Sequence, residues 1–397
     1  MIPPLPPGAR SRAALGLTAA AALGRFELQV CADCGSVQYP PRESCHRCLS
    51  AVLHWREQAG TGELIAETTV HHSNDLYFRA RLPWRLGLVR LDAGPTAVVH
   101  LHQRCAPAPR RVRVGSRLDK SGQGVLVAFP IDEVPNMADD PRLREMTCDP
   151  KFRKVLVTDG RTIVGQAMVR ALAAAGADRV WVGHAEPRDR FAGLADLEAV
   201  PQVAPLLLDL TDSKSVKQAA AEMGGGVDIL INTAEIHGAH GIGSCIGVDA
   251  ARSEMDINYF GLLRLAQEFG PVMRSRGADG GSSATAWVNL LSVYALSNFP
   301  PHGTFCASKA AALSLSQCLR AEMRPAGIRV INVFPGPIDD ERSQMLPPPR
   351  LAPEALAKSV VNALKEGVED VYPGDVAQEW LIRWRENPKV LERELSV

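Results

Sequence analysis

Two groups of residues in this sequence have types and spacings that could do chemistry. The first group lies in the stretch VNLLSVYALSNFPPHGTFCASKAA, residues 288–311. This stretch predicts a buried strand from Val288 to Leu291, a loop that holds Ser292 and a helix that carries Lys309. A serine hydroxyl and a lysine ammonium could serve a reaction at a substrate oxygen, which also needs a titratable acid or base. The residue one helical turn before Lys309 is Phe305, although the chemistry of such a site would require an ionisable hydroxyl at this position.

The second group is a set of four cysteines near the start of the chain. Cys31 and Cys34 form a C-x2-C pair, and ten residues later Cys45 and Cys48 form another. Each pair makes a tight knuckle that directs two thiolates to one point, and two knuckles complete the tetrahedral shell of zinc. Because protein sulfur fills all four positions, we expect a structural zinc site without an open position for water. A disulfide pair or four idle thiols are the alternative interpretations.

The composition limits the class of protein. The chain has 397 residues, of which 46% are hydrophobic and 22% charged, as in ordinary globular proteins, and its length predicts two or more domains. The 44 basic and 44 acidic residues cancel, so the net charge gives no general reason to expect nucleic acid or an anionic membrane as partner. The nine cysteines are not spaced as a disulfide framework, so we expect a reducing, cytoplasmic location.

The apolar run Ala13–Gly24 follows Arg10 and Arg12 and superficially imitates a secretory signal. The Pro-rich opening MIPPLPP and the cysteine cluster directly downstream argue against export. We therefore expect a helix that packs on the residues after it. No apolar run approaches the roughly 20 residues that span a bilayer, so no membrane partner is expected.

A run of short strands follows the cysteines, punctuated by Gly, Pro and Asp. Because no helical pattern interrupts about eighty residues, the run predicts a small closed β-barrel, of which a five-stranded OB-type barrel is the natural candidate. His100 and His102 alternate onto one strand face and could bind a metal, but two ordinary strand side chains are the favoured interpretation. The expected strands are GELIAETTVHH (62–72), RLGLVRLD (85–92), TAVVHLHQ (96–103), RVRVGSRLD (111–119) and GVLVAFPI (124–131).

The pattern changes after the polar, Pro-containing segment 135–152. From Lys154 onward buried strands such as KVLVTDG, PLLLDLTD and IRVINVFPG alternate with helical stretches. This order predicts parallel βαβ units and hence a Rossmann-type doubly wound parallel sheet, which binds ligands at the carboxyl ends of its strands.

The first half resembles the acyl-CoA-associated zinc-ribbon/OB-fold proteins over roughly residues 10–134. The segments CADCGSVQYPPRESCHRCLS, PWRLGLVRLDAG and VLVAFP carry the resemblance. It implies an obligate partner of a thiolase-like enzyme in acyl-CoA breakdown, with a contribution to the acyl-CoA pocket. A ribbon and barrel can also bind single-stranded nucleic acid, although residues 25–134 offer little basic and aromatic surface for it. Arg110, Arg111 and Arg113 would suit phosphates of either ligand or form a solvated strand edge.

The second half resembles the short-chain dehydrogenases/reductases over about residues 153–390. The landmarks agree in order: a glycine loop, DLTD, NTA, an isolated asparagine, a serine, ASK and FPGP. In that family the loop holds the cofactor pyrophosphate, the aspartate of DLTD meets the adenine, and Asn, Ser, Tyr and Lys run the chemistry. The resemblance implies NAD(P)-binding residues Thr158, Gly160, Gly165, Asp209 and Asn232, and catalytic residues Ser292, Lys309 and Asn258, with Phe305 at the tyrosine position.

Several residues depart from the family pattern. The loop TDGRTIVG (158–165) should carry glycines at 159, 163 and 165, but Asp159 and Ile163 replace the first two. Both changes should weaken dinucleotide binding, because glycine lets the backbone turn tightly and approach the pyrophosphate. The helix N-terminus still offers its amide groups. Glu235 replaces the glycine of the NTA motif, and the second strand ends at His184 without an acidic residue for the ribose, so NAD and NADP are both left open.

Phe305 has nothing to ionise, and loss of a general acid/base commonly lowers a rate about 100- to 10,000-fold. Tyr294 is the nearest other phenol in sequence, but a pocket wall is its favoured role, since it is not on the Lys309 helix. These observations favour an accessory subunit of a thiolase-like assembly with a non-catalytic dehydrogenase-like half, paired with an active short-chain dehydrogenase. The alternatives are an active NAD(P)-dependent 3-hydroxyacyl-CoA dehydrogenase or 3-ketoacyl-CoA reductase with an atypical proton donor, and a nucleic-acid-binding module.

We also expect a homo- or hetero-oligomer, because short-chain dehydrogenases usually associate through helices that flank the sheet. The expected domains are an N-terminal helix (1–24), a zinc ribbon (25–50), an OB-fold barrel (51–134), a linker (135–152) and a dehydrogenase-like domain (153–397).

Overall fold

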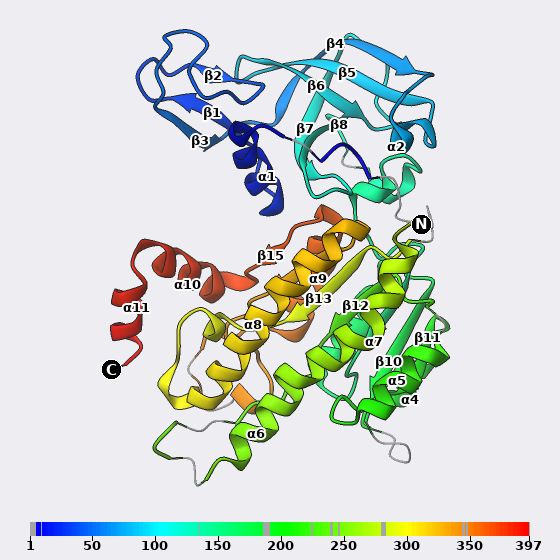
Figure 1. Ribbon diagram of the computed structural model, residues 1–397, viewed down its shortest axis with the longest axis vertical. Helices are drawn as coiled ribbons and strands as arrows, with labels where there is room; N and C mark the ends of the chain where they lie inside the picture. Colours follow the sequence, from blue (N-terminus) through cyan, green and yellow to red (C-terminus); the bar gives the residue numbers. More distant parts are fainter. Residues whose placement is uncertain are drawn as a thin grey trace. The chain divides into compact units, whose positions relative to one another are not determined.

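The chain divides into two compact units, which Figure 1 draws in one view of the computed structural model. One unit contains residues 2–149 and 365–368, and the other contains residues 150–364 and 369–397. The structure describes residues 5–8, 10–133, 135–185, 191–223, 225–238, 241–244, 247–278, 283–343, 346 and 348–396.

The first unit begins with a helical segment and a small sheet. A 3-10 turn and helix α1 (Leu15–Ala22) confirm the helix expected over the apolar run, and they pack against strands of the barrel. The contact is close, because a Cβ on Gly124 would lie 2.8 Å from the carbonyl oxygen of Leu17. The sheet has the antiparallel order β2-β1-β3, with β1 at Glu27–Cys31, β2 at Val37–Gln38 and β3 at Leu53–Glu57.

The predicted five-stranded barrel is confirmed. Its strands close in the order β4-β5-β6-β8-β7, in which only the β6–β8 pair is parallel. Alternate side chains such as Leu64, Val89 and Val112 fill the interior, as the period of two requires. The strands are β4 (Thr61–Val70), β5 (Trp84–Leu91), β6 (Thr96–Leu101), β7 (Arg110–Leu118) and β8 (Gly124–Pro130).

The expectation that no helix interrupts the strands is wrong at one place. Helix α2 (Leu76–Arg79) forms a single turn, and its N-cap Asp75 accepts a hydrogen bond from the amide of Phe78 at 3.1 Å. Four residues are too few to produce a helical period in the sequence. The segment 135–149 also forms two 3-10 turns, Met137–Asp139 and Arg144–Met146, whose apolar side chains pack with Trp84 of the barrel.

The second unit is built on a seven-stranded parallel sheet, as the alternating pattern predicts. The strand order is β11-β10-β9-β12-β13-β14-β15, and every neighbouring pair is parallel. The strands are β9 (Lys154–Val157), β10 (Arg179–His184), β11 (Val203–Leu207), β12 (Ile229–Asn232), β13 (Ala286–Leu290), β14 (Arg329–Val333) and β15 (Asp370–Val371).

Helices cover this sheet, and α5, α7 and α8 pack side by side (Figure 1). Thr162 caps α3 by accepting from the amide of Gly165, and the N-cap role predicted for Asp212 is confirmed by its bond to the amide of Lys214. The helices are α3 (Ile163–Ala174), α4 (Leu194–Glu198), α5 (Ser213–Glu222), α6 (Asp249–Met255), a π-helical segment (Asp256–Gly261), α7 (Leu262–Ser275), α8 (Gly303–Met323), α9 (Pro353–Glu366), α10 (Gly374–Glu386) and α11 (Pro388–Glu394).

The parallel register brings distant parts of the sequence to one edge of the sheet. Ile231 of β12 pairs with Val157 of β9 and with Val288 of β13. The loops that follow these three strands therefore lie next to one another, at the carboxyl ends where doubly wound sheets bind ligands. The glycine-loop segment, the NTA segment and Ser292 all belong to these loops.

We predict that the centre of the sheet carries much of the stability of this unit. Replacement Leu156→Ala on β9, where the side chain is fully buried, should lower the free energy of unfolding by about 2 to 5 kcal/mol. The matched replacement Leu207→Ala on the edge strand β11, where the leucine is 42% exposed, should change it by less than about 0.5 kcal/mol. Urea unfolding of the full-length chain, followed by circular dichroism, measures both, and equal shifts of the midpoint would contradict the prediction.

Candidate functional site

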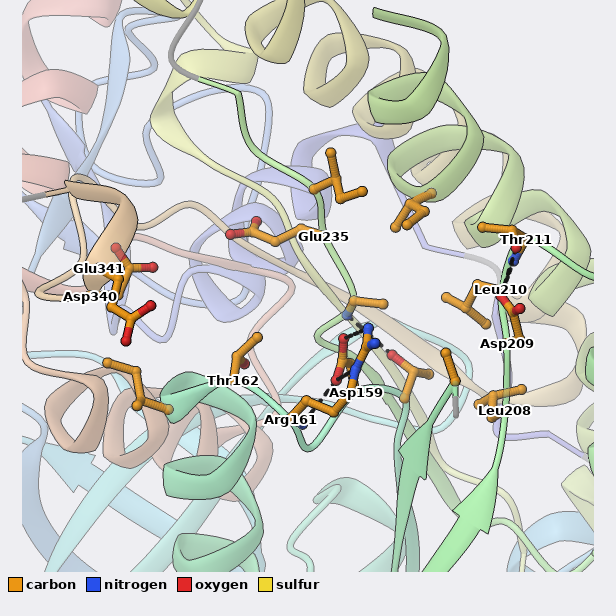
Figure 2. A pocket seen from close by; sticks show the side chains of 16 residues that line it. Asp159, Arg161, Thr162, Leu208, Asp209, Leu210, Thr211, Glu235, Asp340 and Glu341 are labelled. Carbon is orange, nitrogen blue, oxygen red and sulfur yellow. Dashed lines mark hydrogen bonds and ion pairs between the residues drawn. The ribbon is translucent and has the colours of Figure 1, made fainter. Parts of the chain in front are cut away.

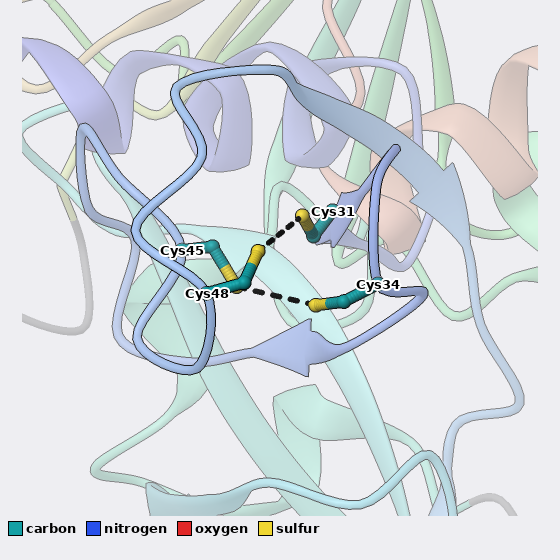
Figure 3. A group of neighbouring side chains, drawn as sticks. All are labelled: Cys31, Cys34, Cys45 and Cys48. Atoms are coloured by element: carbon teal, nitrogen blue, oxygen red, sulfur yellow. Dashed lines mark hydrogen bonds between the residues drawn. The ribbon is translucent and has the colours of Figure 1, made fainter.

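The four ribbon cysteines come together at the end of β1 and in the knuckle after β2 (Figure 3). Their sulfur atoms all lie within 4.8 Å of one another, and the Cys31–Cys48 and Cys34–Cys45 pairs are 3.5 and 3.6 Å apart. A tetrahedral zinc ion with Zn–S bonds of about 2.3 Å requires S···S distances of about 3.8 Å, so this donor set fits zinc.

Backbone amide groups of the ribbon act to lower the pKa of the cysteine thiols. Amide groups of Cys48 and Arg47 lower the pKa of the Cys45 thiol to about 6. The amide of Ser50 also lowers the pKa of Cys48, but the neighbouring thiols of Cys34 and Cys31 outweigh it and raise that pKa to about 12. The four sulfurs therefore cannot all ionise unless a cation is placed among them, and zinc would supply that charge. Across the described part of the chain, no other group of His, Cys, Asp or Glu has this geometry.

The two barrel histidines do not form a metal site. Nδ1 of His100 accepts a hydrogen bond from Trp84 Nε1 at 2.9 Å, and burial lowers the pKa of His100 to about 4. His102 lies one residue beyond the end of β6, and its Nδ1 accepts from the amide of Arg104. Each imidazole has its own protein partner, which agrees with the favoured interpretation.

The arginines of β7 do not form an open basic groove. Arg111 makes two hydrogen bonds to Asp92, of 2.7 and 2.6 Å, and the guanidinium holds the pKa of Asp92 below its usual value. This pairing neutralises the central member of the Arg110–Arg113 run. The strand edge expected for these residues is wrong, because β7 pairs with both β4 and β8 in the closed barrel. Arg110, Arg111 and Arg113 are exposed on the outer face of β7 instead.

The carboxyl edge of the parallel sheet contains a cavity of about 600 Å³. Its walls come from the loops after β9, β10, β11 and β12 and from the turn at residues 340–341 (Figure 2). A volume in this range suits a cofactor or a small ligand. The lining side chains that carry charge are Asp159, Arg161, Asp209, Glu235, Asp340 and Glu341.

Two of the five predicted cofactor-binding residues, Thr158 and Asp209, line this cavity. The Asp209 carboxylate is turned to Thr211, from which it accepts amide and hydroxyl hydrogen bonds of 2.8 and 2.7 Å. Asn232 instead accepts from the Thr158 hydroxyl at 2.9 Å and thereby joins β12 to β9.

The other two predicted residues, Gly160 and Gly165, serve packing. A Cβ on Gly160 would collide with Val182, and a Cβ on Gly165 would collide with the carbonyl oxygen of Asp159. Ile163 stands partly exposed in the cavity wall, at the position where the family pattern has glycine.

Of the three predicted catalytic residues, Ser292 lines a second, much smaller cavity, whereas Lys309 and Asn258 are not among its lining residues. Ser292 and Phe305 line it, and its volume is about 30 Å³, which leaves room for about one water molecule. The Ser292 hydroxyl accepts from the amide of Tyr294 at 3.2 Å. Phe305 does occupy the turn of α8 before Lys309, and its ring is 5.4 Å from the ammonium nitrogen.

Asn258 lies in the π-helical segment and fixes the loop after β12. Its side-chain oxygen accepts from the amide of Ile236 at 3.0 Å, and its nitrogen donates to the Ile236 carbonyl at 2.8 Å. The same nitrogen donates to the hydroxyl of Ser308 on α8 at 2.8 Å. Asn258 therefore links Ile236, the residue after Glu235, to the π-helical segment and to α8.

The Lys309 ammonium has a partner that the motif comparison does not predict. Its Nζ lies 2.8 Å from a carboxylate oxygen of Glu235 and 3.0 Å from the carbonyl oxygen of Leu290. The lysine side chain is 2% exposed and the glutamate 13%, so this ion pair is shielded from water. The sequence does carry one signal for it, because an acidic residue replaces a glycine in a motif that also needs a buried lysine.

Two histidines also line or flank the small cavity. The ring of His237 stacks on Phe305 with centroids 3.8 Å apart, and its Nε2 contacts Nδ1 of His302. Burial lowers the pKa of His302. Tyr294 has the wall role expected of it, since its ring stacks on Phe299 and meets Trp380 edge-on.

The geometry defines a class of protein: a zinc-ribbon and OB-fold module joined to a Rossmann-type dehydrogenase fold. Comparison with known proteins agrees. Residues 18–54 match the family model "ChsH2, rubredoxin-like zinc ribbon domain", residues 55–123 match "ChsH2, C-terminal OB-fold domain" and residues 153–349 match "short chain dehydrogenase".

Curated relatives match about half of the chain. The chain is 34% identical to rat dehydrogenase/reductase SDR family member 7B over 193 residues, which are 46% of this chain and 57% of that protein. It is 30% identical to mouse dehydrogenase/reductase SDR family member 7C over 234 residues, which are 57% of this chain and 71% of that protein. The chain thus spans little more than half the length of the 7B relative.

A short chain dehydrogenase of Burkholderia cenocepacia J2315, solved in complex with NADP, is 32% identical and superposes with a TM-score of 0.56. The match covers 63% of this chain and 99% of that one. The chain belongs to the short chain dehydrogenase family and carries ChsH2-type zinc-ribbon and OB-fold domains ahead of its dehydrogenase domain. Among the residues that the structure describes, no helix is long and apolar enough to cross a membrane.

We predict that the purified full-length chain holds about one zinc ion, bound by four thiolates. Replacement Cys48→Ser should remove the metal, because three thiolates bind zinc far more weakly than four. The matched replacement Cys318→Ser, of another exposed cysteine on α8, should leave the zinc content unchanged. Metal analysis after dialysis measures both.

The zinc should also be released more readily as the pH falls, because protons then compete for the thiolates. A cysteine set that stays metal-free after refolding with zinc would contradict the assignment.

Proposed function

We propose that this chain is an accessory subunit of an assembly that degrades acyl-CoA. In this proposal the ribbon and barrel bind a thiolase-like enzyme, and the dehydrogenase-like half binds an active short-chain dehydrogenase without performing the reduction itself. The two ChsH2-type domains support the first part, because the resemblance that they bear out implies a partner of a thiolase-like enzyme. The pairing makes chemical sense, because a dehydrogenase produces the 3-ketoacyl-CoA that a thiolase cleaves.

The observation that carries the proposal is the environment of Phe305. Its ring stands where the family has the tyrosine acid/base, and it offers no proton to a substrate oxygen. Lys309, which in the family lowers the pKa of that tyrosine, is paired with Glu235. The cavity beside Ser292 holds about one water and is too small for a thioester substrate.

The helices that flank the sheet support an oligomer. Phe260, Leu263, Gln267 and Pro271 recur at helical spacing along the π-helical segment and α7, and this stripe is uncharged. Phe260 is 45% exposed. An uncharged, partly apolar helix face of this kind suits association with a second dehydrogenase-like subunit.

One observation favours the alternative, an active NAD(P)-dependent 3-ketoacyl-CoA reductase. His237 lies against Phe305 and lines the same small cavity as Ser292, so its imidazole could replace the missing phenol as proton donor. The enzymatic alternative therefore depends on His237 rather than on Tyr294.

We predict that the tagged chain, expressed together with thiolase-like and short-chain dehydrogenase proteins of the same organism, purifies with both. Replacement Cys48→Ser should lose the thiolase-like protein while the dehydrogenase stays bound, because the ribbon is expected to make the first contact. Replacement Phe260→Glu should lose the dehydrogenase, since a charge would enter the uncharged stripe. Mass spectrometry of the purified proteins gives the result, and co-purification of neither enzyme would overturn the proposal.

We also predict that the chain alone oxidises neither NADH nor NADPH above background with acetoacetyl-CoA, because a missing general acid lowers a rate about 100- to 10,000-fold. Replacement His237→Asn should then change nothing. Turnover by the unmodified chain that His237→Asn abolishes would favour the reductase instead. The absorbance of the reduced cofactor at saturating substrate measures the rate.

A further inference from the structure

Two acidic residues stand in the cleft at positions where the family pattern has glycine, and each is paired with a cation of the same cleft. Asp159 pairs with Arg161 at 2.8 Å, and Glu235 pairs with Lys309 at 2.8 Å. Both carboxylates are largely buried, with side chains 7% and 13% exposed. A buried carboxylate is retained at low cost only when charge and hydrogen bonds compensate it, and here both do.

The Asp159 carboxylate takes donors of the loop that leads into α3. One oxygen accepts from the backbone amide of Arg161 at 2.9 Å and from its Nε at 3.1 Å, and the other accepts from its terminal nitrogen at 2.8 Å (Figure 2). Backbone amides ahead of a helix are the groups that bind an anionic phosphate in this kind of fold. Asp159 therefore occupies donors that a pyrophosphate would need.

Glu235 takes the Lys309 ammonium at the other end of the cleft. The same ammonium donates a hydrogen bond to the carbonyl oxygen of Leu290. Asn258 holds the backbone of Ile236 with two hydrogen bonds, so the loop that carries Glu235 is fixed toward the lysine. Glu235 and Asp340 line both the larger cavity and the small one beside Ser292. A ligand that reached from one cavity to the other would pass these two carboxylates.

The charge of the larger cavity also disfavours a dinucleotide. Its described lining residues include five carboxylates and one guanidinium, that of Arg161. Arg161 neutralises Asp159, and Lys309 neutralises Glu235. A dinucleotide carries a negatively charged pyrophosphate, which such a lining would repel. The volume of about 600 Å³ would accommodate a cofactor, so lack of space does not exclude a dinucleotide.

We propose that Asp159 and Glu235 are built-in ligands of this cleft, whose carboxylates take the hydrogen-bond donors that a nicotinamide dinucleotide would use. The residues present thus do not fit NAD(P). The hydrogen-bond donors of the cleft are satisfied by its own carboxylates instead of by a cofactor. This inference goes beyond the proposed function, because an accessory subunit could still bind a dinucleotide.

The test is equilibrium binding of NADH and NADPH to the full-length chain by isothermal titration calorimetry, together with the melting temperature with and without each dinucleotide. The unmodified chain should bind neither and show no shift. The double replacement Asp159→Gly and Glu235→Gly should restore the family residues at these two positions and bind at least one dinucleotide, with an affinity about tenfold or more above the detection limit that the unmodified chain fails to reach and with a rise in melting temperature.

A matched control distinguishes the release of hydrogen-bond donors from a general decrease in the negative charge of the cavity. Glu341→Gly removes an exposed carboxylate from the same cavity and leaves both ion pairs in place. It should not bind. Binding by Glu341→Gly equal to that of the double variant would overturn the assignment to Asp159 and Glu235, as would micromolar binding by the unmodified chain.

The double variant leaves the buried Lys309 without its carboxylate and could fail to fold. Single replacement Glu235→Gln keeps a hydrogen-bonding group beside the lysine, and single replacement Asp159→Gly leaves the lysine pair intact. Glu235→Gln should fold and still bind no dinucleotide, whereas Asp159→Gly should gain weak binding of ADP-ribose, which lacks the nicotinamide. Absence of ADP-ribose binding by a folded Asp159→Gly variant would overturn the role of Asp159.

Discussion

The Lys309 ammonium, which is almost completely buried, is the constraint on which the dehydrogenase-like site depends. A buried cation must be paired and hydrogen-bonded, and this one is held by Glu235 and by the carbonyl oxygen of Leu290. Asn258 fixes the backbone beside Glu235, so the glutamate cannot move away without breaking two further hydrogen bonds. Lys309 and Asn258, to which the family resemblance assigns catalytic roles, thus take part in buried contacts within the protein. The ring of Phe305 lies 5.4 Å from the Lys309 ammonium nitrogen.

The zinc ribbon follows the same principle with the signs reversed. Four thiols within 4.8 Å of one another can ionise together only around a cation, so the metal and the fold of the two knuckles depend on each other. The ribbon and the barrel share one hydrophobic core, to which Leu28 of β1 and Leu64 of β4 both belong, and the parallel sheet has a separate one. This separation explains how a zinc-ribbon and OB-fold module and a dehydrogenase fold can coexist in one chain.

Much of the architecture could be predicted, because it follows from periodic patterns. The alternation of apolar residues located all five barrel strands to within a few residues, and the βαβ order predicted the parallel sheet. The four-residue helix α2 was beyond such reasoning, since one turn has no period. For the site, motif spacing placed Ser292, Phe305 and Lys309 together, because parallel strands end at one edge. The contacts of Asn232 and the packing roles of Gly160 and Gly165 could not be read from spacing, since they depend on which side chains the neighbouring strands present.

By itself, the sequence determined the residue types: four cysteines in two knuckles, a phenylalanine where a phenol is expected, and acidic residues at two glycine positions. Only the tertiary structure decided what the acidic residues do. Glu235 and Lys309 are 74 positions apart, and they meet because β12 and β13 are neighbours in the sheet and α8 packs beside them. In the sequence, Glu235 is a departure from a cofactor-binding motif. In the folded chain it is the partner of a buried charge, because electrostatic pairing depends on distance in space and not on position along the chain.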